Sequence, residues 1–154
     1  MSNRWAGRLR LAIVTALAVA VAGLAPRNVA AQSGGFIVVV NASNPTTSIS
    51  KTDLSKLFTK KSRQWPSGSA ALPVDLSLGN PVRDAFTERV HGKSARAIGS
   101  YWQQQIFSGR DVPPPERKSD EEVLDYVRSN AGAVGYVAAG TKLGAGVKAI
   151  AISE

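Results

Sequence analysis

The sequence predicts a single α/β domain with a mixed sheet, arranged as one three-layer lobe. Continuous apolar and β-branched stretches at 36–40, 133–138 and 147–152 have the composition of buried strands. Segments with helical spacing of apolar residues lie between these stretches, and such alternation is typical of layered α/β folds. About 123 residues follow an N-terminal leader, which suits one hydrophobic core.

The leader, residues 1–31, has the features of a secretory signal peptide. It contains a basic start, an uncharged apolar run, a helix-breaking proline and small residues for cleavage (Arg4, Arg8 and Arg10; 11–24; Pro26; Val29 to Ala31). The run is shorter than the roughly 18–20 apolar residues that span a bilayer, which argues against an uncleaved anchor. We therefore expect an unanchored domain, residues 32–154, in the periplasm or an equivalent compartment.

The net charge and the absence of cysteine limit the ligands and partners that we expect. Four of the 19 basic residues and none of the 11 acidic ones belong to the leader, so the formal charge falls from +8 to +4. This surplus is compatible with an anionic ligand or an anionic envelope surface. Nucleic acid is not expected as a partner, because no basic run is interleaved with aromatic residues. The absence of cysteine excludes disulfides, a lipid-modified cysteine and thiolate chemistry.

The first half of the domain alternates strand and helix. After the strand at 36–40, a polar loop contains Pro45, and Ser50 then caps a helix whose apolar stripe is formed by Leu54, Leu57 and Phe58. A basic loop at 59–69 follows, with Trp65 expected to be half-buried. Residues 70–76 predict a second strand, and Pro73 places it at a sheet edge or at a strand start.

Three helices and two strands are expected in the second half. Asn80 caps the first helix, which has Pro81 in its first turn and continues to about His91 before Gly92. Ser94 begins the next helix. The last helix follows a proline-containing loop and starts at the capping box Ser119–Glu122. The buried stripe of the middle helix is predicted from its spacing (Ile98, Tyr101, Trp102, Ile106).

Several motifs, in order, resemble phosphate-binding proteins of ABC transporters. They are Asn44-Pro45, Leu54-Ser-Lys-Leu-Phe58-Thr-Lys60 with Trp65 and Gly68, Arg83-Asp-Ala-Phe86, Tyr101-Trp102, the Ser119 capping box, and Asn130-Ala-Gly-Ala-Val-Gly-Tyr136-Val. Together they cover nearly all of residues 32–154. The resemblance implies a periplasmic binding protein-like fold, a non-enzymatic role in transport, and phosphate or a similar oxyanion as ligand. It also implies an ABC permease or another envelope protein as partner.

The chain departs from this family in two respects. Two-lobed relatives are more than twice as long and bind their ligand between the lobes, whereas this chain resembles one lobe. In the anion-binding turn, the family's arginine, serine, glycine and threonine are replaced by Leu76, Asn80, Pro81 and Val82. A guanidinium, two hydroxyls and a backbone N–H are thereby lost as donors. Any binding by one lobe should be weak, because tight sites bury most of the ligand.

The candidate ligand-binding residues are Ser77, Asn80, Val82 and Arg83, at the start of the helix that Asn80 caps. Free backbone N–H groups and the positive end of the helix dipole favour an anion there, and the polar side chains add donors. The structural alternative is that Asn80 is only a cap and Arg83 a solvated residue. Arg83 is expected to be exposed in both cases.

Other polar and aromatic clusters have structural explanations. Lys60, Lys61 and Arg63 beside Trp65 could dock an acidic partner or lipid headgroups, or form a solvated basic loop. Tyr101, Trp102 and Phe107 could line a pocket, but their spacing favours the core.

His91 is the only histidine, near a helix C-terminus that favours its cationic form. The acidic residues at 120–125 stabilise a helix start, and no catalytic, zinc or phosphate-loop motif is present, so we expect no metal and no cofactor.

The sequence therefore predicts an exported solute-binding module that binds a small oxyanion weakly. The alternative is a periplasmic interaction or sensory adaptor that has lost its ligand and binds a protein partner or itself. A homodimer could rebuild the missing half of the cleft.

Overall fold

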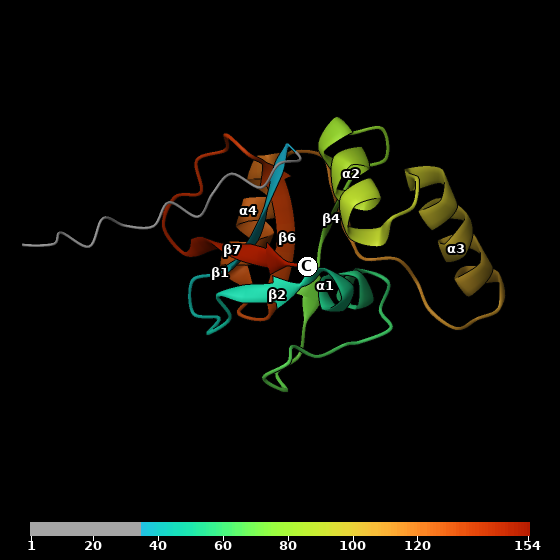
Figure 1. Ribbon diagram of the computed structural model, residues 1–154, viewed down its shortest axis with the longest axis horizontal. Coiled ribbons are helices and arrows are strands. Elements are labelled where there is room, and N and C mark those ends of the chain that lie inside the picture. Colours follow the sequence, from blue (N-terminus) through green and yellow to red (C-terminus); the bar gives the residue numbers. More distant parts are fainter. Residues whose placement is uncertain (1–34) are drawn as a thin grey trace, which may run out of the picture.

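The computed structural model describes residues 35–154, so the predicted signal peptide lies outside the described residues. A five-stranded mixed sheet has the order β2-β7-β1-β6-β3, and β4 and β5 pair separately (Figure 1). The strands are β1 (Phe36–Asn41), β2 (Ser48–Ser50), β3 (Leu72–Pro73), β4 (Asp75–Leu76), β5 (Glu116–Arg117), β6 (Ala133–Ala138) and β7 (Val147–Ser153). The helices are α1 (Lys51–Phe58), α2 (Pro81–Phe86), the π-helix η1 (Thr87–His91), α3 (Ala95–Phe107) and α4 (Asp120–Ser129).

Strand β1 is the centre of the sheet. It runs antiparallel to both neighbours, with Val38 opposite Tyr136 of β6 and Ile150 of β7. The two outer pairs, β2 with β7 and β3 with β6, are parallel, which confirms the predicted mixed sheet. Pro73 lies in β3 at an edge, where its missing N–H leaves no gap in the ladder.

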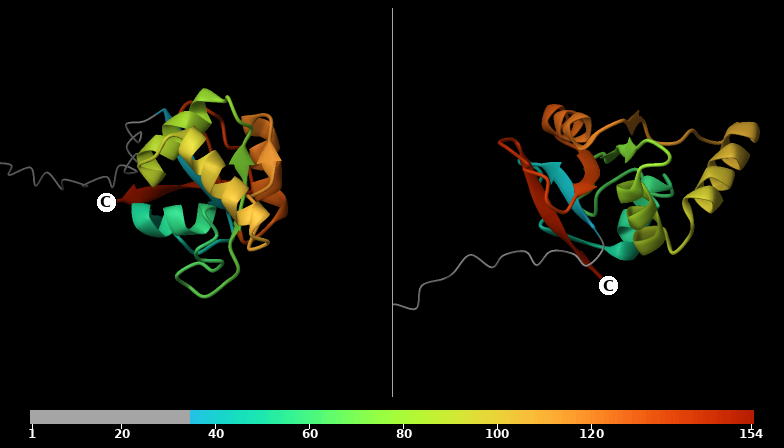
Figure 2. Two further views of the ribbon diagram at one scale, coloured as in Figure 1. Left: turned by 90° about the vertical axis from the view of Figure 1, so that its right-hand side faces the viewer. Right: turned by 90° about the horizontal axis from the view of Figure 1, so that it is seen from above.

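Helices cover both faces of the sheet, which gives the three predicted layers (Figures 1 and 2). Successive strand residues point to opposite faces, and β6 shows both contacts. Tyr136 stacks on Phe86 of α2, with ring centroids 3.8 Å apart. Gly135 faces α4, and a Cβ there would lie 2.7 Å from Val123 Cγ1. Any larger side chain at 135 would therefore push α4 away from the sheet.

Two predicted elements differ from the structure. Residues 70–76 form two short strands in two different sheets, because Val74 N donates to Val134 O while Asp75 N donates to Pro115 O. The helix predicted from Asn80 to His91 is continuous, but its last five residues are the π-helix η1, which ends at Gly92 with φ of 62°. The short strands β2 and β5 have no counterpart in the sequence prediction.

Helix α3 stands apart from the main body (Figures 1 and 2). Ile98 and Trp102 are buried, and Tyr101 OH donates to Thr59 O at 3.0 Å, so its packed side is short. Ile106 and Phe107 are 50% and 89% exposed, which contradicts their predicted places in the core. The spacing correctly predicts the helix, but the rest of the domain does not extend far enough to cover the C-terminal end of α3.

Trp65 is fully buried, not half-buried as the sequence predicted. It is 2% exposed, and its Nε1 donates to Gly132 O at 3.0 Å, so this indole fixes the basic loop to the start of β6. Over residues 35–154, no helix is long and apolar enough to cross a membrane.

Candidate functional site

The four predicted ligand-binding residues lie in the turn between β4 and α2, which contains Ser77 and Asn80, and in the first turn of α2, which contains Val82 and Arg83. Gly79 has φ of 84°, and Asn80 N donates to Ser77 O at 3.2 Å, which closes the turn. Asn80 then begins α2, and its Oδ1 accepts from Val82 N at 2.9 Å. The predicted cap is thus present, and it already satisfies one backbone N–H that an anion could have used.

Arg83 is buried, not exposed as the sequence predicted. Its residue exposure is 5%, and Nη1 donates to Leu76 O at 2.6 Å and to Glu116 Oε1 at 2.5 Å. Nη2 lies 3.3 Å from Asp75 Oδ2. Burial acts to lower the pKa of Arg83, but the two carboxylates outweigh it and raise the pKa, so the guanidinium stays charged. It connects α2 to β4 and β5.

Asp75 is the buried carboxylate of this network. Tyr136 OH and Leu76 N both donate to its Oδ1. Burial raises the pKa of Asp75, although the Arg83 guanidinium and the Tyr136 hydroxyl act in the opposite direction. Burial also raises the pKa of Tyr136, and the neighbouring Asp75 carboxylate adds to that rise. The tyrosine is therefore a neutral donor at physiological pH.

The remaining predicted residues lie beside this network but use their polar groups internally. Ser77 Oγ donates to Arg117 O at 3.2 Å, and Ser77 N donates to the same carbonyl at 2.9 Å. The side chain of Val82 packs on the core, and its N–H is bonded to the Asn80 cap. The structure thus brings the four residues together, and it adds Asp75, Glu116 and Tyr136, which the sequence analysis missed.

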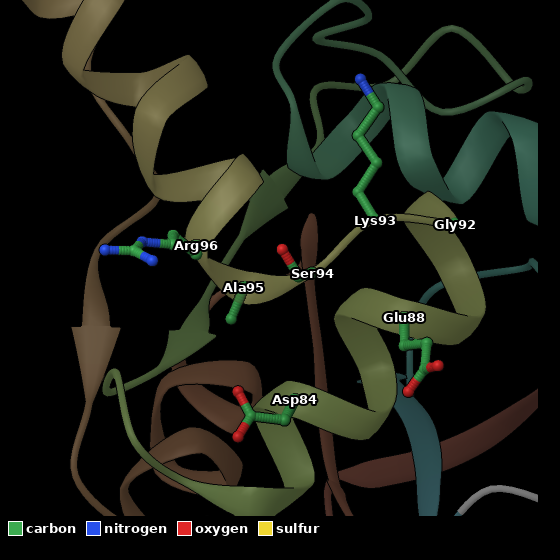
Figure 3. A pocket seen from close by; sticks show the side chains of 7 residues that line it. All are labelled: Asp84, Glu88, Gly92, Lys93, Ser94, Ala95 and Arg96. Atoms are coloured by element: carbon green, nitrogen blue, oxygen red, sulfur yellow. The ribbon is translucent and has the colours of Figure 1, made fainter.

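A surface pocket of about 500 Å³ lies between α2, η1 and the start of α3, and none of the four predicted ligand-binding residues lines it. Figure 3 shows Asp84 and Glu88 on one wall, while the side chains of Lys93 and Arg96 on the other wall point away from these carboxylates. Ser94 caps α3 by accepting from Ala97 N at 3.2 Å. The pocket thus has acidic groups on the α2 side, which oppose an anion placed deep within it. Within residues 35–154, no group of three or more metal-ligating side chains occurs.

His91 lies on the far side of the α2–η1 segment. Its Nδ1 is 2.8 Å from Ser55 Oγ, and its ring packs edge-on against Phe86 at 5.7 Å. Burial lowers the pKa of His91 to about 4, and the positive charges of Lys93 and Arg83 make smaller contributions in the same direction. The histidine is therefore neutral near pH 7, and the expected cation at the helix C-terminus is absent. Its hydrogen bond joins η1 to α1.

Comparison with known proteins finds structural relatives at low sequence identity. A protein described as a phosphate ABC transporter substrate-binding protein, from Clostridium perfringens and with bound phosphate, has a TM-score of 0.60 and 20% identity. The match covers 77% of this chain and 44% of that one. An ABC-type phosphate transport receptor from Vibrio cholerae has a TM-score of 0.58 and 21% identity, with 77% and 46% covered. No family model and no curated protein sequence matches the chain.

A third structure gives the same result. A protein described as a possible phosphate binding protein, from Planctomyces limnophilus, has a TM-score of 0.59 and 19% identity, and the match covers 78% of this chain and 42% of that one. The chain thus spans less than half the length of each of these three proteins. These matches confirm the predicted periplasmic binding protein-like fold.

Proposed function

We propose that this chain is an exported, non-enzymatic solute-binding module of the phosphate-transporter type. The observation that carries the proposal is the fold, which aligns over 77% of the chain with part of a protein whose structure contains phosphate. The predicted signal peptide supports a periplasmic location, and an ABC permease or another envelope protein is the proposed partner. The proposed ligand is a small oxyanion such as phosphate.

The proposed binding position is the start of α2, at Ser77, Asn80, Val82 and Arg83. Pro81 is exposed there, so the helix start faces solvent, and the helix dipole favours a negative charge. Arg83 contributes its backbone N–H, because its guanidinium already bonds to Leu76 and Glu116. Ser77 lies at the edge of the turn, and its hydroxyl would have to exchange its bond to Arg117 O for one to the anion. Binding should be weak, since the cap occupies one N–H and carboxylates offset the charge of Arg83.

A charge-changing cap variant tests this position without removing the cap. Asp caps a helix about as well as Asn, so Asn80→Asp keeps the fold while placing a carboxylate where the anion would bind. We expect phosphate and sulfate to raise the melting temperature of the parent and to have no such effect on Asn80→Asp. Ser94→Asp makes the same kind of change at α3 and should respond to both anions like the parent.

One observation favours a second candidate function, an interaction or sensory adaptor without a ligand. The polar side chains around the α2 start donate to or accept from this protein's own groups, as expected if the turn now has a structural role. In this alternative, a protein partner or a second copy binds the domain. A sizing column distinguishes the two. A strict monomer whose melting temperature responds to anions excludes the adaptor, whereas self-association with no anion response favours it.

A further inference from the structure

The C-terminal end of α3 and the loop after it form a surface with exposed apolar and basic side chains. We call this surface the α3 tip, and it consists of Ile106, Phe107, Arg110 and Val112 with Lys61 and Arg63 from the basic loop. Its three apolar side chains are 50%, 89% and 59% exposed, and they are the larger part of the exposed large hydrophobic residues between 35 and 154. Exposed apolar side chains grouped in one place indicate a contact surface.

Two segments that are distant in sequence meet at this surface. Arg63 Nη2 lies 2.7 Å from Asp111 Oδ2, and Lys60 Nζ lies 3.8 Å from Asp111 Oδ1. Thr59, the first residue of the basic loop, accepts a hydrogen bond from Tyr101 of α3 through its carbonyl oxygen. The basic loop is therefore held beside the residues that follow α3, and both contribute to one surface.

The charge of the α3 tip is positive. The segments 59–63 and 106–113 contain four basic residues, Lys60, Lys61, Arg63 and Arg110, and one acid, Asp111. The Asp111 side chain is only 16% exposed and lies between Arg63 and Lys60. Lys61, Arg63 and Arg110 are exposed. The exposed charges of these two segments are therefore mainly cationic, because the one carboxylate is largely covered.

We propose that the α3 tip docks the protein on a membrane surface rich in anionic phospholipids. Cationic side chains attract the headgroups, while Phe107 and its apolar neighbours enter the boundary between headgroups and acyl chains. The shape supports this occupant, because α3 projects from the body and none of the pockets described for residues 35–154 is lined by Ile106, Phe107 or Val112 (Figure 2). A symmetric dimer through this patch is disfavoured, since it would bring like charges together.

Vesicle co-sedimentation tests the proposal. The experiment uses the chain from Gln32 onward, because the apolar leader would bind lipid by itself and the whole described core lies after it. A cooperative thermal melt of each variant is checked first. We expect the parent to bind vesicles that contain both phosphatidylglycerol and phosphatidylcholine at low salt and to be released at high salt. It should not bind vesicles of phosphatidylcholine alone.

Two substitutions and two matched controls complete the experiment. Phe107→Ser should weaken the partition by about tenfold, because one inserted aromatic side chain is lost. Arg110→Glu should weaken it by about tenfold or more, because one attractive charge is lost and one repulsive charge is added. Leu78→Ser changes another exposed apolar residue, 63% exposed, and Lys142→Glu another exposed cation, and both should bind like the parent.

Three outcomes would overturn the proposal. The parent could stay in the supernatant with every vesicle, which is the result expected if the tip docks on an acidic protein segment instead. Phe107→Ser and Arg110→Glu could bind as well as the parent. Alternatively, the two controls could lose binding as strongly as the tip variants, in which case a diffuse charge effect explains the partition.

Discussion

The α2 start and the α3 tip contain similar kinds of side chains in opposite environments. At the α2 start, Arg83 is 5% exposed and bonds to Leu76 and Glu116, with Asp75 beside it. At the α3 tip, Arg110 is exposed and Phe107 is 89% exposed. The first region uses its cation to hold the fold together, whereas the second presents cations and an aromatic ring to the solvent.

This difference separates stability from recognition. A buried ion pair costs much to desolvate, and removing one partner leaves the other uncompensated. An exposed cation costs little to change, so its effect appears mainly in binding. We therefore expect substitutions at the α2 network to act on the free energy of unfolding, and substitutions at the α3 tip to leave it nearly unchanged.

Arg83→Met is expected to have one of the two largest effects on stability. It leaves Asp75 buried without its guanidinium, so the free energy of unfolding should fall by about 3–5 kcal/mol. Arg89→Met is the matched control, because the Arg89 side chain is 44% exposed and, within residues 35–154, its ion-pair partner is Glu154. That control should change stability by about 1 kcal/mol or less. Urea unfolding of both variants measures the difference. Equal losses in the free energy of unfolding would show that the buried Arg83 contributes no more to stability than the exposed Arg89.

Acid should destabilise the protein through His91. The folded state holds the neutral imidazole with a pKa of about 4, while the unfolded chain takes up the proton near pH 6.5. This contribution is therefore present above pH 6.5 and is lost as the pH falls toward about 4. Each pKa unit corresponds to about 1.4 kcal/mol.

The variant His91→Asn isolates the contribution of His91 to the acid sensitivity. In His91→Asn, the amide oxygen can still accept from Ser55, but no group titrates there, so the loss of stability between about pH 6.5 and 5 should be smaller. Denaturant midpoints measured across that pH interval give the comparison. If parent and variant lose stability equally, the acid sensitivity arises elsewhere.

A smaller effect is expected at the helix cap. Asn80→Ala removes the acceptor for Val82 N and should lower the free energy of unfolding by about 0.5–2 kcal/mol. Asn80→Asp should retain most of that stability, because it restores an acceptor. Thermal melting of the two variants, side by side, separates the cap from any anion effect. A cap role is excluded if alanine and aspartate are equally damaging.

The smallest expected effect on stability is that of Phe107→Ser, within about 0.5 kcal/mol of the parent. Phe86→Ala is the buried counterpart, since Phe86 is 1% exposed and stacks on Tyr136. It should cost about 3–5 kcal/mol. A large loss in Phe107→Ser would mean that the α3 tip is covered by the rest of the molecule in solution.

Local patterns predicted most of the elements and failed where distant segments meet. The caps at Ser50, Asn80, Ser94 and Ser119 could be predicted because cap and helix are neighbours in sequence. The burial of Arg83 could not, because its partner Glu116 is 33 residues away. One signal existed: Arg83 shares helical spacing with Phe86 and Val90, which places it on the buried side of α2.

The exposure of the α3 tip could not be predicted either. The apolar residues at 98, 102 and 106 have the spacing of a buried stripe, but the spacing does not reveal how far the supporting surface extends. Likewise, residues 70–76 have the composition of one strand, and only the positions of Val134 and Pro115 divide it between two sheets. In both cases the deciding contact is tertiary.

An amide NMR titration with phosphate is the sharpest test of oxyanion binding at the α2 start. Oxyanion binding there should give saturable shifts of the Val82, Arg83 and Asp84 amide signals in the parent and in Ser94→Asp, and these shifts should be lost in Asn80→Asp. Shifts confined to another region, or no saturable shifts at any phosphate concentration, would contradict it.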